Sequence, residues 1–137
     1  MNKEMLVNAA KNAMCAAYAP YSGYMVGAAL LCEDGSVYTG CNVENAAYSV
    51  TNCAERTAFF KAVSEGKRQF KAMAVCGGKH GLIADECTPC GVCRQVMREF
   101  CDDSFIVYTV SNTQVRAYSL GELLPHSFGA AQISENP

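Results

Sequence analysis

The chain has 137 residues and a mass of 14.7 kDa, which is the size of one domain. Half of the residues are apolar and 18% are charged, a composition that excludes a disordered chain and a coiled coil. The net charge is -2 and the isoelectric point is near 5.6, which disfavours nucleic acid and an anionic membrane surface as partners. We therefore expect a single domain over residues 1–137 that binds neither.

Apolar periodicity and turn residues predict alternating helices and strands. The first half of the chain predicts a helix over 2–18, strands over 24–32 and 36–40 around an Asp34-Gly35 turn, a loop over 42–52, and a helix over 53–65 capped by Asn52. The second half predicts a strand over 71–76, a loop to Pro89, a helix over 90–101, strands over 105–110 and 114–118, and a short helix over 120–124. This order predicts an α/β layer fold with a partly parallel sheet.

The chain contains nine cysteines, an odd number that argues against a secreted disulfide scaffold. The N-terminus has the charges of Lys3 and Glu4 and lacks the pattern of a signal peptide. Residues 12–32 carry no charge, but Pro20 and Gly23 break this stretch, so it does not predict a membrane-spanning helix. We expect a cytoplasmic protein whose thiols are reduced, some of them serving metal binding or catalysis.

Three cysteines stand at the predicted starts of two helices. Cys53 begins one helix, and Cys90 and Cys93 lie three residues apart on one face of the other. Exposed amide groups and the helix dipole at these positions favour thiolates. Side by side, the two helices would bring three sulfurs to one zinc ion and leave a fourth position for water, as in catalytic zinc sites.

Two neighbours of Cys53 suit such a site. Glu55 is two residues away, where a carboxylate reaches a metal-bound water without being a ligand and transfers protons. Zinc-dependent base deaminases share this combination of Cys ligands, a P-C-x-x-C motif and a non-ligand glutamate. Three thiolates give a zinc site a formal charge of -1, and we expect Arg56 to donate hydrogen bonds to them and offset that charge.

Other reactive side chains are predicted to be structural. Five cysteines lie in apolar patterns and are expected in the core: Cys15, Cys32, Cys41, Cys76 and Cys101. Cys87 stays open between a core residue, a fourth ligand and an oxidation partner. His80 and His126 are expected in loops, and the basic cluster Lys67, Arg68 and Lys71 at a solvated helix end.

Nearly the whole chain resembles the small homotetrameric cytidine deaminases. The motifs that carry the resemblance are Pro20-Tyr21-Ser22, Val26-Gly27-Ala28-Ala29-Leu30, Gly40-Cys41-Asn42-Val43-Glu44-Asn45-Ala46, Cys53-Ala54-Glu55-Arg56-Thr57-Ala58, Pro89-Cys90-Gly91-Val92-Cys93-Arg94-Gln95-Val96, Glu122-Leu123-Leu124-Pro125 and Phe128. The resemblance implies a three-layer α-β-α sandwich with a mixed sheet of about five strands, assembled as a tetramer with shared active sites.

The resemblance also implies a reaction and its residues. Cytidine and 2'-deoxycytidine would be hydrolysed to uridine and 2'-deoxyuridine plus ammonia in pyrimidine salvage, by water activated on one zinc ion per subunit. Cys53, Cys90 and Cys93 would hold the zinc, and Glu55 would shuttle protons. Substrate contacts would come from Asn42 and Glu44 at the sugar 3'-hydroxyl, Ala54 at the pyrimidine edge, Tyr24 beside the pyrimidine, and Tyr48 and Phe128 lent by neighbouring subunits.

The chain departs from the family pattern at two positions. Tyr24 stands where the family commonly has Phe, which adds a hydroxyl beside the pyrimidine. Val92 stands where Ala is common, and we expect it to be buried and to change packing alone.

Three alternative functions compete with the nucleoside deaminase. A deaminase of another aminated small molecule, such as blasticidin S, would share the zinc motifs and differ in the sugar pocket; residues 42–46 and Arg56 favour the nucleoside enzyme. A polynucleotide-editing deaminase would need a positive channel with stacking aromatics, which the sequence lacks. A zinc-stabilised binding module would need a fourth ligand and no role for Glu55.

Overall fold

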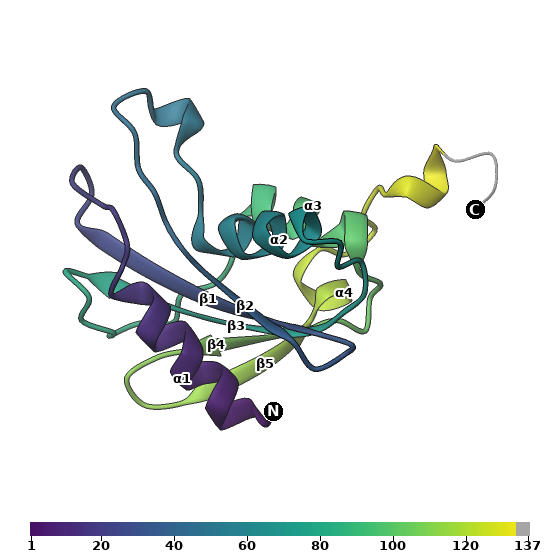
Figure 1. The fold of residues 1–137 in the computed structure, drawn as a ribbon, viewed down its shortest axis with the longest axis horizontal. Coiled ribbons are helices and arrows are strands. Elements are labelled where there is room, and N and C mark those ends of the chain that lie inside the picture. The colour runs from purple at the N-terminus through teal and green to yellow at the C-terminus, as the bar shows by residue number, and fades with distance from the viewer. Residues whose placement is uncertain (134–137) are drawn as a thin grey trace.

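The computed structural model describes residues 1–133 and contains one five-stranded sheet with helices on both faces (Figure 1). Its elements in chain order are α1 (Lys3–Met14), β1 (Tyr24–Cys32), β2 (Val37–Cys41), the short 3₁₀ helix η1 (Tyr48–Val50), α2 (Ala54–Ser64), β3 (Phe70–Lys79), α3 (Gly91–Phe100), β4 (Ile106–Val110), β5 (Val115–Ser119), α4 (Leu120–Leu123) and η2 (Ala130–Gln132).

The sheet is mixed, with the strand order β2-β1-β3-β4-β5. β1 pairs antiparallel with β2 and β3, and β4 pairs antiparallel with β5. β3 and β4 are parallel, and α3 lies in the crossover between them. The expected partly parallel sheet of about five strands is therefore confirmed.

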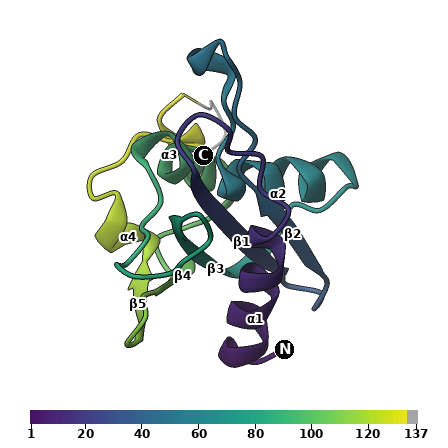
Figure 2. The same ribbon diagram turned by 90° about the vertical axis from the view of Figure 1, so that its left-hand side faces the viewer.

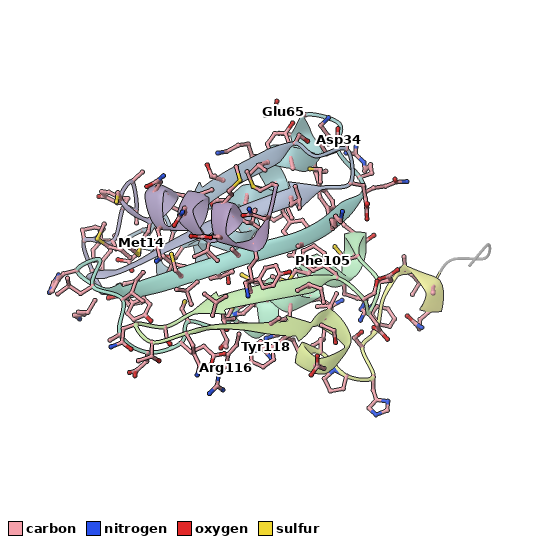
Figure 3. All side chains as sticks on the ribbon, turned by 90° about the horizontal axis from the view of Figure 1, so that it is seen from below. Met14, Asp34, Glu65, Phe105, Arg116 and Tyr118 are labelled. Carbon is pink, nitrogen blue, oxygen red and sulfur yellow. The ribbon has the colours of Figure 1, made fainter. Side chains whose placement is uncertain are left out.

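Two apolar cores lie on opposite faces of the sheet, because successive residues of a strand point to opposite sides. Ala28 and Leu30 of β1 belong to the core that α2 and α3 cover. Ala29 and Leu31 belong to the core that α1 covers, which is the face seen in Figure 3. The predicted α-β-α sandwich is thus confirmed, and from Gly27 to Cys32 both faces of β1, which lies between β2 and the central strand β3, are buried.

Two glycines allow the helices to approach the sheet closely. A Cβ atom on Gly27 would lie 2.1 Å from the Ala10 carbonyl oxygen of α1. A Cβ atom on Gly40 would lie 2.5 Å from the Ala54 carbonyl oxygen at the start of α2. Gly40 therefore sets the height above β2 of the α2 N-terminus, which carries four predicted site residues, Cys53, Ala54, Glu55 and Arg56.

Two elements differ in length from the sequence expectation. α1 ends at Met14 and not at residue 18, because the backbone of Tyr18 bonds to Asn42 and Glu44 and forms a bridge to Val43. β3 continues to Lys79, beyond the expected residue 76, because β1 pairs with it as far as Tyr24 opposite Lys79. In both cases a long-range backbone contact overrides the local pattern.

Two segments leave the body of the domain (Figures 1 and 2). Residues 42–53 form a long projection with η1 near its tip, and residues 125–133 form an extended C-terminal segment that contains η2. Each carries an exposed aromatic ring: Tyr48 is 75% exposed and Phe128 is 56% exposed. Within residues 1–133, no helix is long and apolar enough to cross a membrane.

Candidate functional site

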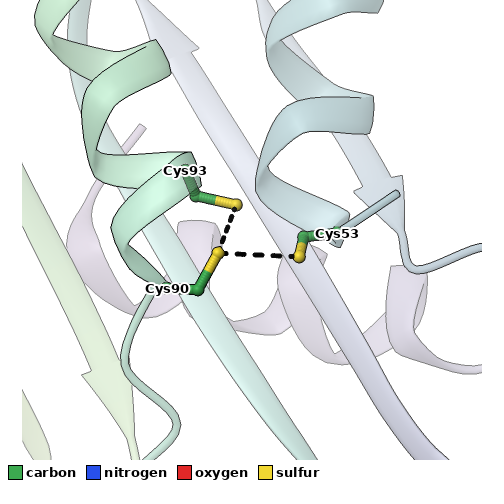
Figure 4. Close-up of side chains that lie close together, drawn as sticks. All are labelled: Cys53, Cys90 and Cys93. Carbon is green, nitrogen blue, oxygen red and sulfur yellow. Dashed lines mark hydrogen bonds between the residues drawn. The ribbon is translucent and has the colours of Figure 1, made fainter. Parts of the chain in front are cut away.

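The N-termini of α2 and α3 bring the three predicted zinc ligands together (Figure 4). Cys53 and Cys90 are the N-cap residues of the two helices, and neither side chain makes a capping hydrogen bond to its helix, so neither sulfur is held by the backbone amides there. Cys93 lies one turn into α3. The expectation that Asn52 caps α2 was wrong, because the N-cap residue is the next one, Cys53. The side-chain amide of Asn52 instead donates to the Thr57 hydroxyl at 3.1 Å.

The distances between the sulfurs fit a zinc ion. Cys90 Sγ lies 3.9 Å from Cys53 Sγ and 3.5 Å from Cys93 Sγ, and the three sulfurs lie within 4.8 Å of one another. Zinc–sulfur bonds of about 2.3 Å at tetrahedral angles separate neighbouring sulfurs by about 3.8 Å. In residues 1–133 this group has three members, so zinc would keep a position for water, as catalytic sites do.

Arg56 lies beside the group of sulfurs. Its Nη2 donates to Cys53 Sγ at 3.3 Å, so the guanidinium reaches one of the sulfurs expected to accept from it. A hydrogen bond from Cys93, together with the Arg56 guanidinium, lowers the pKa of Cys53 to about 5 although the thiol is half-buried. The site therefore favours a thiolate at Cys53 at neutral pH, the form that zinc requires.

Glu55 lies in the first turn of α2 and is 4% exposed. Burial, with a smaller contribution from the nearby Cys53 charge, raises the pKa of its carboxyl to about 7. A carboxyl with a pKa near neutrality both accepts and gives up a proton, as a proton shuttle must.

The residues expected at the sugar side form a hydrogen-bonded unit with the start of β1. Asn42 accepts from the Val26 amide at 2.9 Å and donates to the Tyr24 carbonyl at 2.8 Å. Glu44 Oε1 accepts from the amides of Tyr21 and Ser22 at 2.9 and 3.1 Å. These contacts join the 42–53 projection to the turn before β1.

The remaining predicted substrate residues divide into two groups. Ala54 is buried at the start of α2 and Tyr24 is partly exposed at the start of β1. Tyr48 and Phe128 lie on the two projecting segments and are exposed, and the Tyr48 ring packs edge-on against the ring of Tyr21 at a centroid distance of 6.1 Å. Gln95 of α3 holds the second segment by donating to the Phe128 carbonyl at 2.8 Å.

Several expectations about burial were wrong. Val92 is 57% exposed on α3, so it does not pack into this domain's core. Among the expected core cysteines, Cys32 and Cys76 are buried and Cys41 and Cys101 are half-buried, whereas Cys15 is exposed just after α1 ends. An apolar sequence pattern does not distinguish an exposed helix position from a buried one when the packing partner is unknown.

Cys87 does not join the metal-ligand group in the described residues. It is half-buried beside the core under α2 and α3, and burial raises the pKa of its thiol to about 12. Of the three roles considered for Cys87, namely core residue, fourth metal ligand and oxidation partner, the structure favours the core residue.

Two hydrogen-bonding residues near the site had no predicted role. The Ser22 hydroxyl donates to Glu44 Oε2 and accepts from the Tyr24 amide at 2.9 Å. Lys79, at the end of β3, donates to the Ser22 carbonyl at 2.6 Å. Ser22 belongs to the motif Pro20-Tyr21-Ser22, so a signal was present, but the partner of its hydroxyl is 22 residues away and depends on the fold.

Comparisons with known proteins identify the family of this chain. Residues 1–109 match the model of the cytidine and deoxycytidylate deaminase zinc-binding region. A cytidine deaminase of Sporosarcina psychrophila is 50% identical over 135 residues, covering 98% of this chain and 96% of its own. One of Halalkalibacterium halodurans is 47% identical over 137 residues, with 98% and 100% covered. The crystal structure of cytidine deaminase from Burkholderia pseudomallei superimposes with a TM-score of 0.87 at 48% identity and covers 93% of this chain and 100% of its own.

The blasticidin-S deaminase of Bacillus cereus is a more distant relative. It is 28% identical over 104 residues, covering 73% of this chain and 74% of its own.

Proposed function

Because the chain belongs to the cytidine and deoxycytidylate deaminase family, we propose that it hydrolyses cytidine and 2'-deoxycytidine to uridine and 2'-deoxyuridine plus ammonia. The observation that carries this proposal is the buried Glu55, with its raised pKa, beside three convergent cysteine sulfurs. Residues 1–137 would act as one catalytic domain, since a single sheet carries both cores.

Cys53, Cys90 and Cys93 would hold the zinc ion. When bound, zinc supplies the Lewis acidity that activates water toward C4 of the pyrimidine. Arg56 keeps the ligand set from carrying an uncompensated negative charge. The Glu55 carboxyl would deliver a proton to N3 of the base, take up another from the water and pass it to the departing amino group.

The substrate would lie between the α2 N-terminus and the start of β1. The backbone at Ala54 would contact the pyrimidine edge and Tyr24 its ring. Asn42 and Glu44 would bind the sugar 3'-hydroxyl. Asn42 is fixed by hydrogen bonds to the start of β1 and Glu44 by hydrogen bonds to the turn before it. These bonds support the assignment, because side chains that are already held in place lose little conformational freedom when they bind substrate.

We infer a homotetramer whose active sites are shared between subunits. Apolar side chains are exposed on the 42–53 projection, on α2 and α3 and on the C-terminal segment; they are Tyr48, Val50, Phe60, Val92, Phe128 and Ile133. Exposed apolar groups on several elements are typical of a surface that binds another protein. Tyr48 and Phe128 would then enter the site of a neighbouring subunit, with Phe128 stacking on the base.

The setting would be pyrimidine salvage in the cytoplasm. All nine cysteines are free thiols in the structure, which suits a reducing compartment. Fractionation of the source cells would test the location.

The experiment that tests the function follows the ultraviolet absorbance of cytidine with purified protein before and after zinc removal by a strong chelator. Zinc-dependent conversion to uridine, restored by added zinc, is the expected result. If folded, zinc-loaded protein leaves cytidine unchanged but deaminates blasticidin S, the site belongs to a different small-molecule deaminase. If it deaminates neither, a zinc-stabilised binding role is favoured.

A further inference from the structure

Most of the hydrogen-bond acceptor positions on the Glu44 carboxylate are occupied by donors from the protein itself. A carboxylate offers about four lone-pair positions. Oε1 accepts from the backbone amides of Tyr21 and Ser22, and Oε2 accepts from the Ser22 hydroxyl. The position left over is on Oε2, next to the hydroxyl of Ser22.

Ser22 therefore connects the residues proposed to bind substrate. Its hydroxyl donates to Glu44 and accepts from the Tyr24 amide, and the Tyr24 carbonyl in turn accepts from Asn42. Lys79 holds the same turn by its bond to the Ser22 carbonyl. Without the Ser22 hydroxyl, Oε2 would have no protein donor within residues 1–133, and only the two amides on Oε1 would hold the carboxylate.

We propose that Ser22 is a positioning residue, whose hydroxyl fixes Glu44 Oε2 so that it accepts a hydrogen bond from the 3'-hydroxyl of the nucleoside sugar. The inference rests on the proposed function. The Ser22 hydroxyl and the Lys79 charge also lower the pKa of Glu44, so the carboxylate stays ionised and acts purely as an acceptor.

The test compares Ser22→Ala with wild type on cytidine and on 3'-deoxycytidine, which lacks the hydroxyl in question. For cytidine, KM should rise about tenfold, the size of one lost hydrogen bond to a charged group, while kcat changes by less than about twofold. For 3'-deoxycytidine, KM should be nearly the same for both proteins. Ser22→Thr, which keeps the hydroxyl, should restore the wild-type KM.

Ser36→Ala is the matched control, because the Ser36 hydroxyl also donates to a nearby carboxylate, that of Asp34, at 2.6 Å in the turn between β1 and β2. It should leave both substrates unaffected. If Ser22→Ala lowers the folded fraction or zinc content, Lys79→Met provides the same comparison, with a KM increase of about two- to threefold confined to cytidine.

Two results would overturn the inference while the proposed function stands: an unchanged KM for cytidine, or an equal loss with both substrates. Failure of the wild type to convert cytidine would overturn the proposed function itself and the inference with it.

Discussion

At the residue scale, Glu55 and Arg56 have separable tasks although they are adjacent. Glu55 is buried, and its carboxyl has a pKa near neutrality, which suits transfer of protons. Arg56 donates to Cys53 Sγ, so in the proposed zinc site it would contribute positive charge beside the sulfurs. Substitutions at the two positions should therefore change different quantities.

Glu55→Gln should keep the fold and the zinc, because the amide has nearly the same shape and Glu55 is not in the ligand group. Deamination should fall at least about 10³-fold, since the amide cannot carry the protons. The measurements are kcat for cytidine and zinc content by atomic absorption. Cys53→Ala is the contrasting variant and should lose zinc. Retention of most activity by Glu55→Gln would show that the proton-shuttle role is wrong.

Arg56→Gln should lower kcat about tenfold, because a more negative site makes the metal a weaker acid toward water. Zinc content should change much less than turnover, since the three sulfurs remain. Arg68→Gln is the control, because that exposed guanidinium donates to the backbone carbonyls of Val63 and Lys67 away from the site. Equal turnover in wild type and Arg56→Gln would contradict charge compensation.

At the element scale, glycines set the distance between the helix layers and the sheet. Gly40 lies under the start of α2, on the face that carries the sulfurs, and Gly27 lies under α1 on the opposite face. Replacing each glycine by alanine therefore separates an effect on zinc binding, expected at position 40, from an effect on folding stability, expected at both positions.

Gly27→Ala and Gly40→Ala should both destabilise the fold by roughly 2–3 kcal/mol, because each new Cβ meets helix backbone and not a flexible side chain. Zinc affinity should fall with Gly40→Ala alone, since α2 would shift Cys53 relative to α3. Thermal unfolding and competition with a chromogenic chelator measure the two effects. Similar zinc affinities in the two variants would argue against this role of Gly40.

At the scale of the whole molecule, the projecting segments explain why the isolated chain exposes aromatic rings. Tyr48 and Phe128 lie on these segments and are 75% and 56% exposed. In the proposed tetramer these rings complete the sites of neighbouring subunits, so activity depends on assembly.

Co-expression of Glu55→Gln with Phe128→Ala subunits tests this sharing. Phe128→Ala alone should raise KM about tenfold through lost aromatic stacking, and Glu55→Gln alone should be inactive. In mixed tetramers, a subunit with an intact Glu55 can receive an intact Phe128 from a neighbouring subunit. Part of the activity should therefore show the wild-type KM. Activity no higher than that of the Phe128→Ala subunits by themselves would show that each site uses its own ring.

The sequence by itself predicted the order of the helices and strands and proposed the cysteines and Glu55 as candidate ligands and proton-transfer residue, because helix starts, turns and metal-ligand spacing are local patterns. The tertiary structure decided that Cys53 and Cys90, 37 residues apart, lie 3.9 Å from each other, and that Val92 and Cys15 are exposed. It also decided that Ser22 bonds to Glu44. Such contacts depend on how distant segments pack across the sheet, and no local pattern encodes that packing.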